Sequence, residues 1–504
     1  MTESVAVIDL GSNSARLVIS NIYHNGAYNL VYNQKESVRL SEGMEKDNCL
    51  QPAAIERAIR TLNAFAHMCQ IHKADKIIAV TTAAVRNARN GQEFIQLVKD
   101  KTNIDLEIIS GEKEAKIGSI AVTNTIDIRD ALLFDLGGGS TELTLIRDHK
   151  VVELISIPFG AITLTEKFKT QDKVSNENLT ALTEYIKKTF AAIPWLQNLK
   201  LPLVGIGGTA RNIAKMDQRQ KNYPFPKIHN YRMGMISFEN LWQTLIRTNL
   251  NQRRKLPGLS SERADIIIAG INIVKTLFEV SAGTQFIVSG SGLREGLFMH
   301  YYLQRENQPD VLPDILMHST RNMLLFYKGN TLHAYHVSYL ALSLFDGWKD
   351  LLQLTGRERT LLKVAAFLHD IGITINYYDH TRHTAYLVEN ARLFGLTHRE
   401  QMLVAVVAGW HHGMSGKAVR RNYYEFLDEA DWSTARKLAL LLSLAESLDE
   451  TQMHRIQSVS ATIENDKAKL TLKTFEEDAL IERQSAEKHT KWFRKEMQIP
   501  LIIE

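Results

Sequence analysis

The chain contains one short pattern twice. VAVIDLGSNSARLVIS occupies residues 5–20, ALLFDLGGGSTELTLI occupies residues 131–146, and five of the sixteen aligned positions are identical. In each copy an apolar, β-prone run ends in an aspartate, Asp9 or Asp135, passes through Gly and Ser, and continues as a second apolar run. Each copy therefore predicts strand, turn and strand, and the duplication predicts two related halves.

The two turns are candidate phosphate-binding sites. Small residues let successive backbone N–H groups point at one anion, and an aspartate at the mouth can hold a hydrated divalent cation against it. A ligand-free β-turn fits either copy alone, but the matched pair favours a phosphate held from two sides. The expected phosphate contacts are Gly11, Ser12, Asn13 and Ser14 in the first turn and Gly137, Gly138, Gly139, Ser140 and Thr141 in the second, with Asp9 and Asp135 as metal ligands.

The segments after the turns predict an α/β fold. Each copy continues as a three-stranded meander, whereas a P-loop or Rossmann unit would lead from its Gly-rich turn straight into a helix. Helix and strand then alternate, which predicts one α/β domain over residues 1–125 and a second over residues 126–305. The expected helices lie at 52–72, 111–122, 178–193 and 263–278, and the expected later strands at 76–80, 106–110, 203–206 and 286–289.

A third domain is expected at residues 314–504. Residues 304–313 are polar and contain two prolines, which favours a linker there. Beyond it the spacing of apolar residues is mostly helical, and a short hairpin is expected near residues 458–474. The expected helices are 332–345, 357–369, 383–394, 398–410 and 435–448.

Composition excludes several classes of protein. The 60 Lys and Arg residues against 56 Asp and Glu give a net charge of only +4, so no nucleic-acid partner is expected. Cys49 and Cys69 lack the spacing of a metal site, and two cysteines do not indicate a disulfide framework. The start of the chain shows no export signal, and no apolar run reaches the roughly 18 residues of a membrane span. We therefore expect a cytoplasmic protein.

Further polar residues are candidates for the same cleft. Glu142 follows the second turn, and Glu114 lies where a strand passes into a helix, a place where carboxylates often only complement the helix dipole. A phosphatase needs one carboxylate to orient and deprotonate water, which makes both glutamates candidate catalytic groups. Arg86 could bind phosphate. Gly207, Gly208 and Thr209 form a third turn of small residues, and residues 289–292 a fourth.

Seven strings occur in a fixed order along residues 1–305: IDLGSNS, TTAAVRNA, SGEKEA, FDLGGGSTE, GIGGTAR, ERADIIIAG and SGSGLREG. This set resembles the exopolyphosphatase and guanosine pentaphosphate phosphohydrolase (Ppx/GppA) family. The resemblance implies duplicated domains of the actin-like, ribonuclease H-like ATPase superfamily. It also implies Glu114 as general base, and Asp135, Glu142 and Asp9 as residues that place water or Mg²⁺.

The implied activity is processive removal of terminal phosphate from inorganic polyphosphate. Some members of the family instead remove the 5′ γ-phosphate of guanosine pentaphosphate, and guanosine tetraphosphate is a possible regulator. A nucleotide-gated regulatory module is the alternative from another functional class, and a sugar kinase fits less well because water-activating glutamates suit hydrolysis. The family also implies a homodimer.

A long polyanion needs a basic path across the surface. The candidate basic segments are Lys187-Lys188, Arg253-Arg254-Lys255, Arg420-Arg421 and residues 488–495. Each of these segments is also typical of an ordinary solvated face.

The C-terminal region resembles the HD metal-dependent phosphohydrolase fold. His336, His369, Asp370, His383 and His411 have spacings similar to those of HD metal ligands, and such a donor set suits a transition metal or a di-metal centre. The last ligand of that pattern is normally an aspartate in Ala-Asp-x-Leu, whereas this chain has Glu446 there and Asp449 three residues on. Both a metal-binding domain and a vestigial one remain open.

Overall fold

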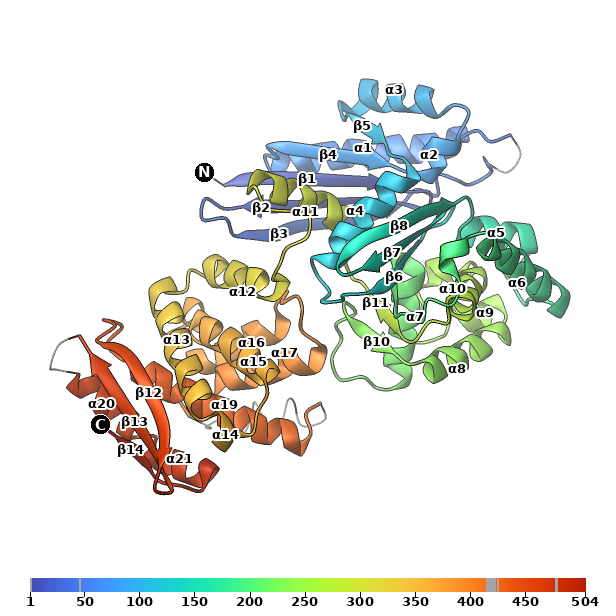
Figure 1. Ribbon diagram of the computed structural model, residues 1–504. Coiled ribbons are helices and arrows are strands. Elements are labelled where there is room, and N and C mark those ends of the chain that lie inside the picture. Colours follow the sequence, from blue (N-terminus) through green and yellow to red (C-terminus); the bar gives the residue numbers. More distant parts are fainter. Residues whose placement is uncertain (1, 45–46, 414–422, 424–425, 476–478) are drawn as a thin grey trace. The chain divides into compact units, whose positions relative to one another are not determined.

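The computed structural model describes residues 2–44, 47–413, 423, 426–475 and 479–504 (Figure 1). Contacts divide the chain into two compact units. Unit 1 comprises Met1–His24 and Tyr28–Pro313, and unit 2 comprises Asn25–Ala27 and Asp314–Glu504. The α/β fold followed by a mostly helical domain agrees with the prediction, and the division of residues 1–305 into two domains at residue 125 stays a prediction.

Unit 1 contains a five-stranded sheet with the strand order β3-β2-β1-β4-β5. β1, β2 and β3 form an antiparallel meander, and β4 and β5 continue the sheet in parallel on the other side of β1. Val5, Ala6, Val7 and Ile8 are fully buried, as expected for a central strand covered on both faces. The strands are β1 (Glu3–Leu10), β2 (Ser14–Ile22), β3 (Tyr28–Ser37), β4 (Lys76–Thr81) and β5 (Leu106–Ile108).

The second sheet of unit 1 repeats this topology in the order β10-β11-β9-β6-β7-β8. β6, β7 and β8 form the meander, β9 and β11 are the parallel strands, and β10 adds an antiparallel edge. The strands are β6 (Ala131–Leu136), β7 (Thr141–Arg147), β8 (Lys150–Ile157), β9 (Leu203–Ile206), β10 (Tyr231–Met233) and β11 (Phe286–Val288). The duplicated sequence pattern therefore corresponds to a duplicated sheet.

Helices cover both sheets. In the longest helix of unit 1, Ala58, Leu62 and Phe65 recur at helical spacing and are fully buried in the core of the first sheet. The helices are α1 (Pro52–Ile71), α2 (Ala83–Asn87), α3 (Gly91–Thr102), α4 (Gly111–Thr123), α5 (Ala161–Phe168), α6 (Asn176–Ala191), α7 (Gly207–Gln220), α8 (Met235–Ile246), α9 (Leu250–Arg253), α10 (Ile267–Ser281) and α11 (Leu293–Arg305), with 3-10 turns η2 (Pro194–Leu196) and η3 (Ser261–Arg263).

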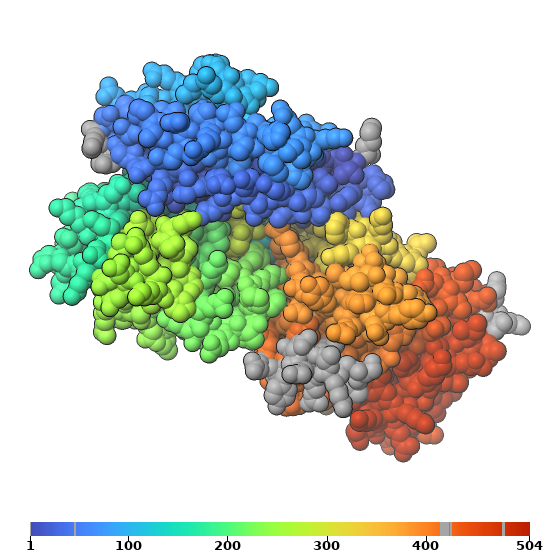
Figure 2. Space-filling view, turned by 180° about the vertical axis from the view of Figure 1, so that it is seen from behind, coloured from blue at the N-terminus to red at the C-terminus, as the bar shows by residue number. Residues whose placement is uncertain are grey.

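Two of these helices link the halves of unit 1. α4 packs on β7 and β8 of the second sheet, α11 packs on β1 of the first sheet, and α4 and α11 pack on each other (Figure 1). Their backbones approach closely at Gly296, where an added Cβ would lie 2.2 Å from the Ile117 carbonyl oxygen. From behind, Figure 2 shows the blue first half and the green second half meeting along an extended boundary. α4 can therefore present residues of the first half to the second sheet.

Unit 2 is mainly helical. Capping boxes at Thr355 with Glu358 and at Thr397 with Glu400 start two of its helices. The helices are α12 (Ile315–Phe326), α13 (Thr331–Gly347), α14 (Lys349–Leu352), α15 (Gly356–Leu368), α16 (His380–Asn390), α17 (His398–Gly409), α19 (Glu429–Ser447), α20 (Leu480–Glu487) and α21 (Thr490–Met497), with the 3-10 turn η4 (Ile371–Thr374). The strands β12 (Ile456–Glu464), β13 (Lys467–Thr474) and β14 (Leu501–Ile503) form a small sheet.

Several boundaries differ from the sequence-based expectation. The strand expected to reach residue 110 ends at Ile108, because the Ser110 hydroxyl accepts a hydrogen bond from the Lys113 N–H and caps α4. The helix expected from residue 263 begins at Ile267, after the 3-10 turn η3. The hairpin of unit 2 gains β14 as a parallel third strand. Within the described part of the chain, no helix is both long and apolar enough to cross a membrane.

Candidate active site

The two small-residue turns have the same internal hydrogen bond. The Gly11 N–H donates to the Ser14 carbonyl oxygen at 3.1 Å, and the Gly137 N–H donates to the Ser140 carbonyl oxygen at 3.0 Å. Each bond closes the turn between an inner strand and its antiparallel neighbour. The duplication therefore extends from the sequence to the backbone geometry of the turns.

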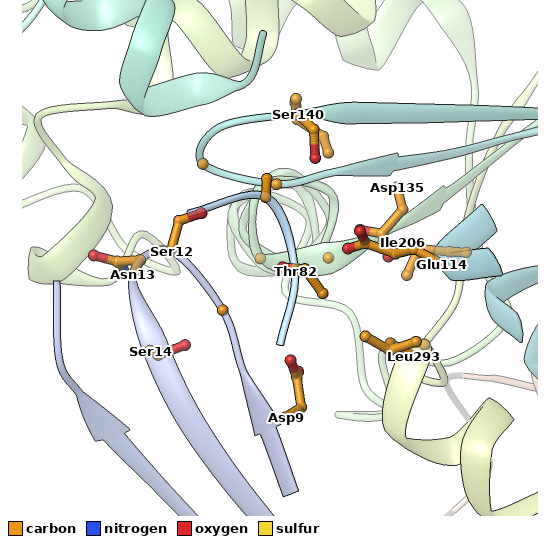
Figure 3. Close-up of a pocket in the computed structure, with 18 of the residues that line it drawn as sticks. Asp9, Ser12, Asn13, Ser14, Thr82, Glu114, Asp135, Ser140, Ile206 and Leu293 are labelled. Carbon is orange, nitrogen blue, oxygen red and sulfur yellow. The ribbon is translucent and has the colours of Figure 1, made fainter. Parts of the chain in front are cut away.

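The turns face each other across a cleft. A Cβ added at Gly138 would lie 3.5 Å from Ser12 Cβ, and one added at Gly139 would lie 3.5 Å from Ser12 Oγ. Both glycines line the cleft together with Ser12, Asn13 and other residues of the two turns. Figure 3 shows Ser12 and Asn13 from the first turn and Ser140 from the second around this space. An anion held there can contact both turns.

Asp9, Glu114 and Asp135 line the cleft, and the carboxylate of Glu142 lies beside them. Asp9 is near the end of β1 and Asp135 near the end of β6, while Glu114 comes from the first turn of α4 (Figure 3). Glu142 on β7 is the register partner of Asp135 and is only 2% exposed. Its carboxylate accepts a hydrogen bond from the Ser156 hydroxyl at 2.9 Å. The packing of α4 on the second sheet is what brings Glu114 to Glu142.

Burial dominates the electrostatics of these groups. It raises the pKa of Asp9 and raises that of Asp135 to about 6. Burial together with the charge of Asp135 raises the pKa of Glu142 to about 7. For Glu114, burial and the charges of Glu142 and Asp135 raise the pKa well above its usual range. So many buried carboxylates repel one another and favour a cation among them.

Arginines also line the cleft. Arg16 on β2, Arg211 on α7, Arg263 on η3 and Arg294 on α11 all line it. Burial lowers the pKa of Arg16 and of Arg263 to about 10, which leaves both guanidinium groups charged at neutral pH. Four guanidinium groups beside two backbone turns can bind several phosphate oxygens at once.

Two glycines make room for these charges. Gly208 lies against the Arg263 guanidinium, and a Cβ at this position would be 2.0 Å from its carbon. Gly207 has a φ of +89°, and a Cβ there would lie 2.9 Å from the Asp135 carboxylate. The third small-residue turn is therefore the start of α7, placed directly against the charged groups of the cleft.

Comparisons with known proteins identify the family. The model of the Ppx/GppA phosphatase family matches residues 18–305, and the model of Ppx/GppA phosphatase domain III matches residues 315–489. This chain belongs to the Ppx/GppA phosphatase family. It is accordingly an enzyme that hydrolyses phosphoanhydride bonds, and members of such phosphatase families typically need a divalent metal.

Solved structures agree with the Ppx/GppA assignment. A family member from Aquifex aeolicus is 29% identical with a TM-score of 0.54, over 61% of this chain and 100% of that one. The type II variant of the Aquifex aeolicus Ppx/GppA phosphatase is 30% identical with a TM-score of 0.50, over 59% and 98% of the two chains. An exopolyphosphatase from Cytophaga hutchinsonii, 24% identical with a TM-score of 0.56 over 62% and 100%, shares the fold.

Most residues expected from the sequence line the cleft of this Ppx/GppA protein. They are Asp9, Gly11, Ser12, Asn13, Ser14, Glu114, Asp135, Gly137, Gly138, Gly139, Ser140, Gly207 and Gly208, joined by Gly292 from the fourth turn. Their convergence is a geometric result, and their individual roles stay predictions.

The other expected residues are not among the lining residues. Arg86 donates to the Ile109 carbonyl at 2.8 Å and pairs with the lining residue Glu114 at 3.3 Å. Thr141 is fully buried and donates to the Phe159 carbonyl oxygen at 2.8 Å, so its hydroxyl supports the second turn. Thr209 packs beneath Gly270. Glu142 is in contact with Ser156.

Sequence reasoning missed the four cleft arginines. Arg211, Arg263 and Arg294 each stand inside a string that carries the family resemblance, GIGGTAR, ERADIIIAG and SGSGLREG. Arg16 occupies the position in the first copy that Glu142 occupies in the second. Alignment of the two copies was therefore a signal for Arg16, whereas the other three converge only through the fold.

The expected basic path is not a uniform surface feature. Arg253 is fully buried and donates to the Ala264 carbonyl at 2.8 Å, so it stabilises the second half of unit 1. Lys187 is half exposed and pairs with Glu279 at 2.9 Å. Arg420 and Arg421 lie outside the described residues. The basic path and the homodimer stay predictions.

The histidines expected to bind metal in unit 2 are only partly brought together. His369, Asp370 and His411 lie in one cluster, and they are joined there by His333 and His380. The expected ligands His336 and His383 are not part of this arrangement. His336 is instead grouped with Asp449 and His454. His333 and His336, like His380 and His383, are three residues apart on one helix and share much of one helix face, so helical spacing alone does not distinguish them.

Proposed function

We propose that this chain is an exopolyphosphatase that removes terminal phosphate from inorganic polyphosphate with the help of Mg²⁺. The observation that carries the proposal is the gathering of four carboxylates and four arginines around two facing backbone turns. In the proposed reaction the turns and arginines donate to the terminal phosphate, and the carboxylates hold the cation and the attacking water beside it.

Asp9, Asp135 and Glu142 are the residues that would hold Mg²⁺. Their donor set consists only of oxygen atoms, which fits this hard cation. Burial raises the pKa of all three carboxyl groups, so their ionised forms are disfavoured unless a cation compensates the charge. When bound, the cation supplies charge neutralisation on the phosphate oxygens.

Glu114 is the proposed general base. It lies in the first turn of α4, lines the cleft, and pairs with Arg86 at 3.3 Å. From there its carboxylate orients a water molecule for in-line attack and accepts its proton. Arg16, Arg211, Arg263 and Arg294 bind the phosphate oxygens, including those of the leaving polymer.

The lining favours polyphosphate over guanosine pentaphosphate. Among the described residues that line the cleft there is no Phe, Tyr, Trp or His side chain on which a guanine could stack. Charged groups and backbone N–H groups dominate instead, and these recognise phosphates without regard to a base. Guanosine pentaphosphate hydrolysis remains the second candidate because its terminal phosphates present the same oxygens.

The proposal is tested by phosphate release from long-chain polyphosphate with and without Mg²⁺. Glu114→Gln keeps the size of the side chain and removes the base, so kcat should fall by about 10² to 10⁴. Glu112→Gln is the matched control, since Glu112 lies in the same helical turn and is exposed. Unchanged release by Glu114→Gln would contradict the mechanism.

Substrate choice is measured in the same assay. Initial rates on polyphosphate should exceed those on guanosine pentaphosphate, and the reverse order would assign the nucleotide as the substrate. Nucleotide binding without turnover of either compound would assign a regulatory module. Cytoplasmic location and dimerisation are further expectations of the proposal and are not needed for this test.

A further inference from the structure

A second cluster of chemically active side chains lies in unit 2 and shares no residue with the phosphate cleft. His333 comes from the first turn of α13, His369 and Asp370 follow α15, His380 begins α16, and His411 follows α17. The side chains of His333, His369 and His411 are at most 3% exposed. Four helices thus deliver four imidazoles and one carboxylate to one buried place.

The imidazoles face one another in pairs through the same ring atom. His333 Nε2 and His369 Nε2 are 3.2 Å apart, and His380 Nε2 and His411 Nε2 are 3.0 Å apart. In three of the rings Nδ1 contacts a backbone carbonyl, of Ala366 for His369, Tyr377 for His380 and Ala408 for His411.

These contacts fix which nitrogen carries the proton. A carbonyl oxygen only accepts, so each of these Nδ1 atoms donates, and Nε2 of a neutral ring then presents a lone pair. Two facing lone pairs at about 3 Å repel unless a cation lies between them. The same arrangement, Nδ1–H on a carbonyl and Nε2 free to ligate, is typical of metal-binding histidines.

Asp370 completes both pairs with different oxygens. Its Oδ2 lies 3.8 Å from His333 Nε2 and 3.7 Å from His369 Nε2. Its Oδ1 lies 3.4 Å from His380 Nε2 and 3.5 Å from His411 Nε2. A metal–nitrogen distance of about 2.1 Å places neighbouring ligand atoms about 3.0 to 3.4 Å apart in octahedral or tetrahedral geometry. The two triangles of ligand atoms are close to that size.

We propose that unit 2 binds two divalent transition-metal ions that share Asp370, one held by His333 and His369 and the other by His380 and His411. Nitrogen-rich ligand sets select such metals over Mg²⁺, which prefers oxygen. Glu446 forms a group with Asp370 and His411 and is the additional ligand available to the second ion. His412 pairs with Glu446 at 3.1 Å.

Asp449 contributes to the cluster by orienting the His333 ring. It is fully buried, accepts a hydrogen bond from His333 Nδ1 at 2.8 Å, and also accepts one from the His454 backbone N–H at 2.9 Å. This contact turns His333 Nε2 toward His369 and makes Asp449 a positioning residue. Glu446 and Asp449 are the acidic residues found where the usual pattern has the aspartate of Ala-Asp-x-Leu. Glu446 is available as a ligand, whereas Asp449 positions the His333 ring.

The experiment counts metal in the full chain. Purified protein is stripped with a chelator, returned to excess Mg²⁺ to occupy oxygen sites, loaded with Co²⁺ or Mn²⁺, and desalted before elemental analysis. Wild type should retain two ions per chain, and Co²⁺ should show absorption bands typical of nitrogen ligation. Asp370→Asn should lose both ions, because Asp370 is shared.

Single histidine variants locate each ion. His380→Gln should retain one ion, whereas the matched control His383→Gln, one turn further along α16, should retain two. Thermal unfolding of each variant without added metal reports whether it is folded. Fewer than two ions in folded wild type, or equal loss in His380→Gln and His383→Gln, would overturn the assignment.

Discussion

The two halves of unit 1 use one scaffold for opposite charges. In the first half Asp9 is paired across the strands with Arg16, and in the second half Asp135 is paired in the same way with Glu142. The turns that follow have equivalent hydrogen bonds, so the backbone is conserved between the halves while one side chain changes sign. The two halves thus present equivalent turns beside a basic residue in one case and an acidic residue in the other, and the proposed function assigns these two residues different roles.

Arg16 and Glu142 occupy equivalent positions in the two halves, and neutralising Glu142 should have the largest effect on activity. Glu142→Gln preserves the size of a side chain that is 2% exposed and its contact with Ser156, but it removes the charge beside Asp135. We expect kcat for phosphate release to fall by about 10³. In Ser156→Ala, which removes only one hydrogen bond to Glu142, kcat should fall by about tenfold or less. Similar losses in both variants would show that kcat depends on the packing around Glu142 and not on its charge.

The same carboxylate should make stability depend on pH. Burial raises the pKa of Glu142 from 4.5 to about 7, so the folded state binds more protons than the unfolded state between these values. Stability conferred by the protonated group is therefore present below pH 4.5 and is lost as the pH rises to about 7, by up to about 3 kcal/mol.

Chemical denaturation at several pH values in the presence of a chelator measures this effect. Glu142→Gln should lose most of the decline and should be more stable than wild type at pH 8. Divalent cations should stabilise wild type more than the variant, because they bind the ionised carboxylates of the folded state. Parallel pH curves for the two proteins would exclude Glu142 as the group responsible.

Removal of the Arg16 side chain should have a smaller effect on activity, mainly through substrate binding. Arg16→Ala deletes one of four cleft guanidinium groups, so kcat/KM for polyphosphate should fall by about 10- to 100-fold, with most of the change in KM. Arg129→Ala is the control, because that side chain is 72% exposed and pairs with Asp148 at the surface. A fall confined to kcat would place Arg16 on the reacting atoms and would break the proposed division of roles.

Prediction from the sequence succeeded where the signal was local. The two turns and their flanking strands are predicted by short patterns of apolar and small residues. The start of α4 is predicted because the strand before it ends at that point. The arginines were missed because residues 16, 211, 263 and 294 come from β2, α7, η3 and α11 and meet only in the folded chain. Arg86 looked like a phosphate ligand because the sequence does not show that Glu114 and a carbonyl occupy its guanidinium.

The histidines of unit 2 show that sequence-based prediction is also limited for residues close together in the chain. His333 and His336 lie one turn apart on α13, so helical spacing alone does not distinguish them. The structure does so through Asp449, which holds the His333 ring, and through the other helices that present His369 and His411. Which of the two histidines joins the cluster of His369 and Asp370 is therefore a property of tertiary packing.

The smallest expected effect tests how far the two turns remain equivalent. An added Cβ at Gly11 would lie 3.5 Å from the Ser14 carbonyl oxygen, an ordinary contact, while one at Gly137 would lie 3.2 Å from the Ser140 carbonyl oxygen. Gly137→Ala should therefore destabilise the protein by about 1 kcal/mol, and Gly11→Ala by about 0.5 kcal/mol or less. Thermal unfolding of the two variants against wild type measures the difference. Equal destabilisation would mean that the turns tolerate a side chain alike, and that only Arg16 and Glu142 distinguish the two halves at this point.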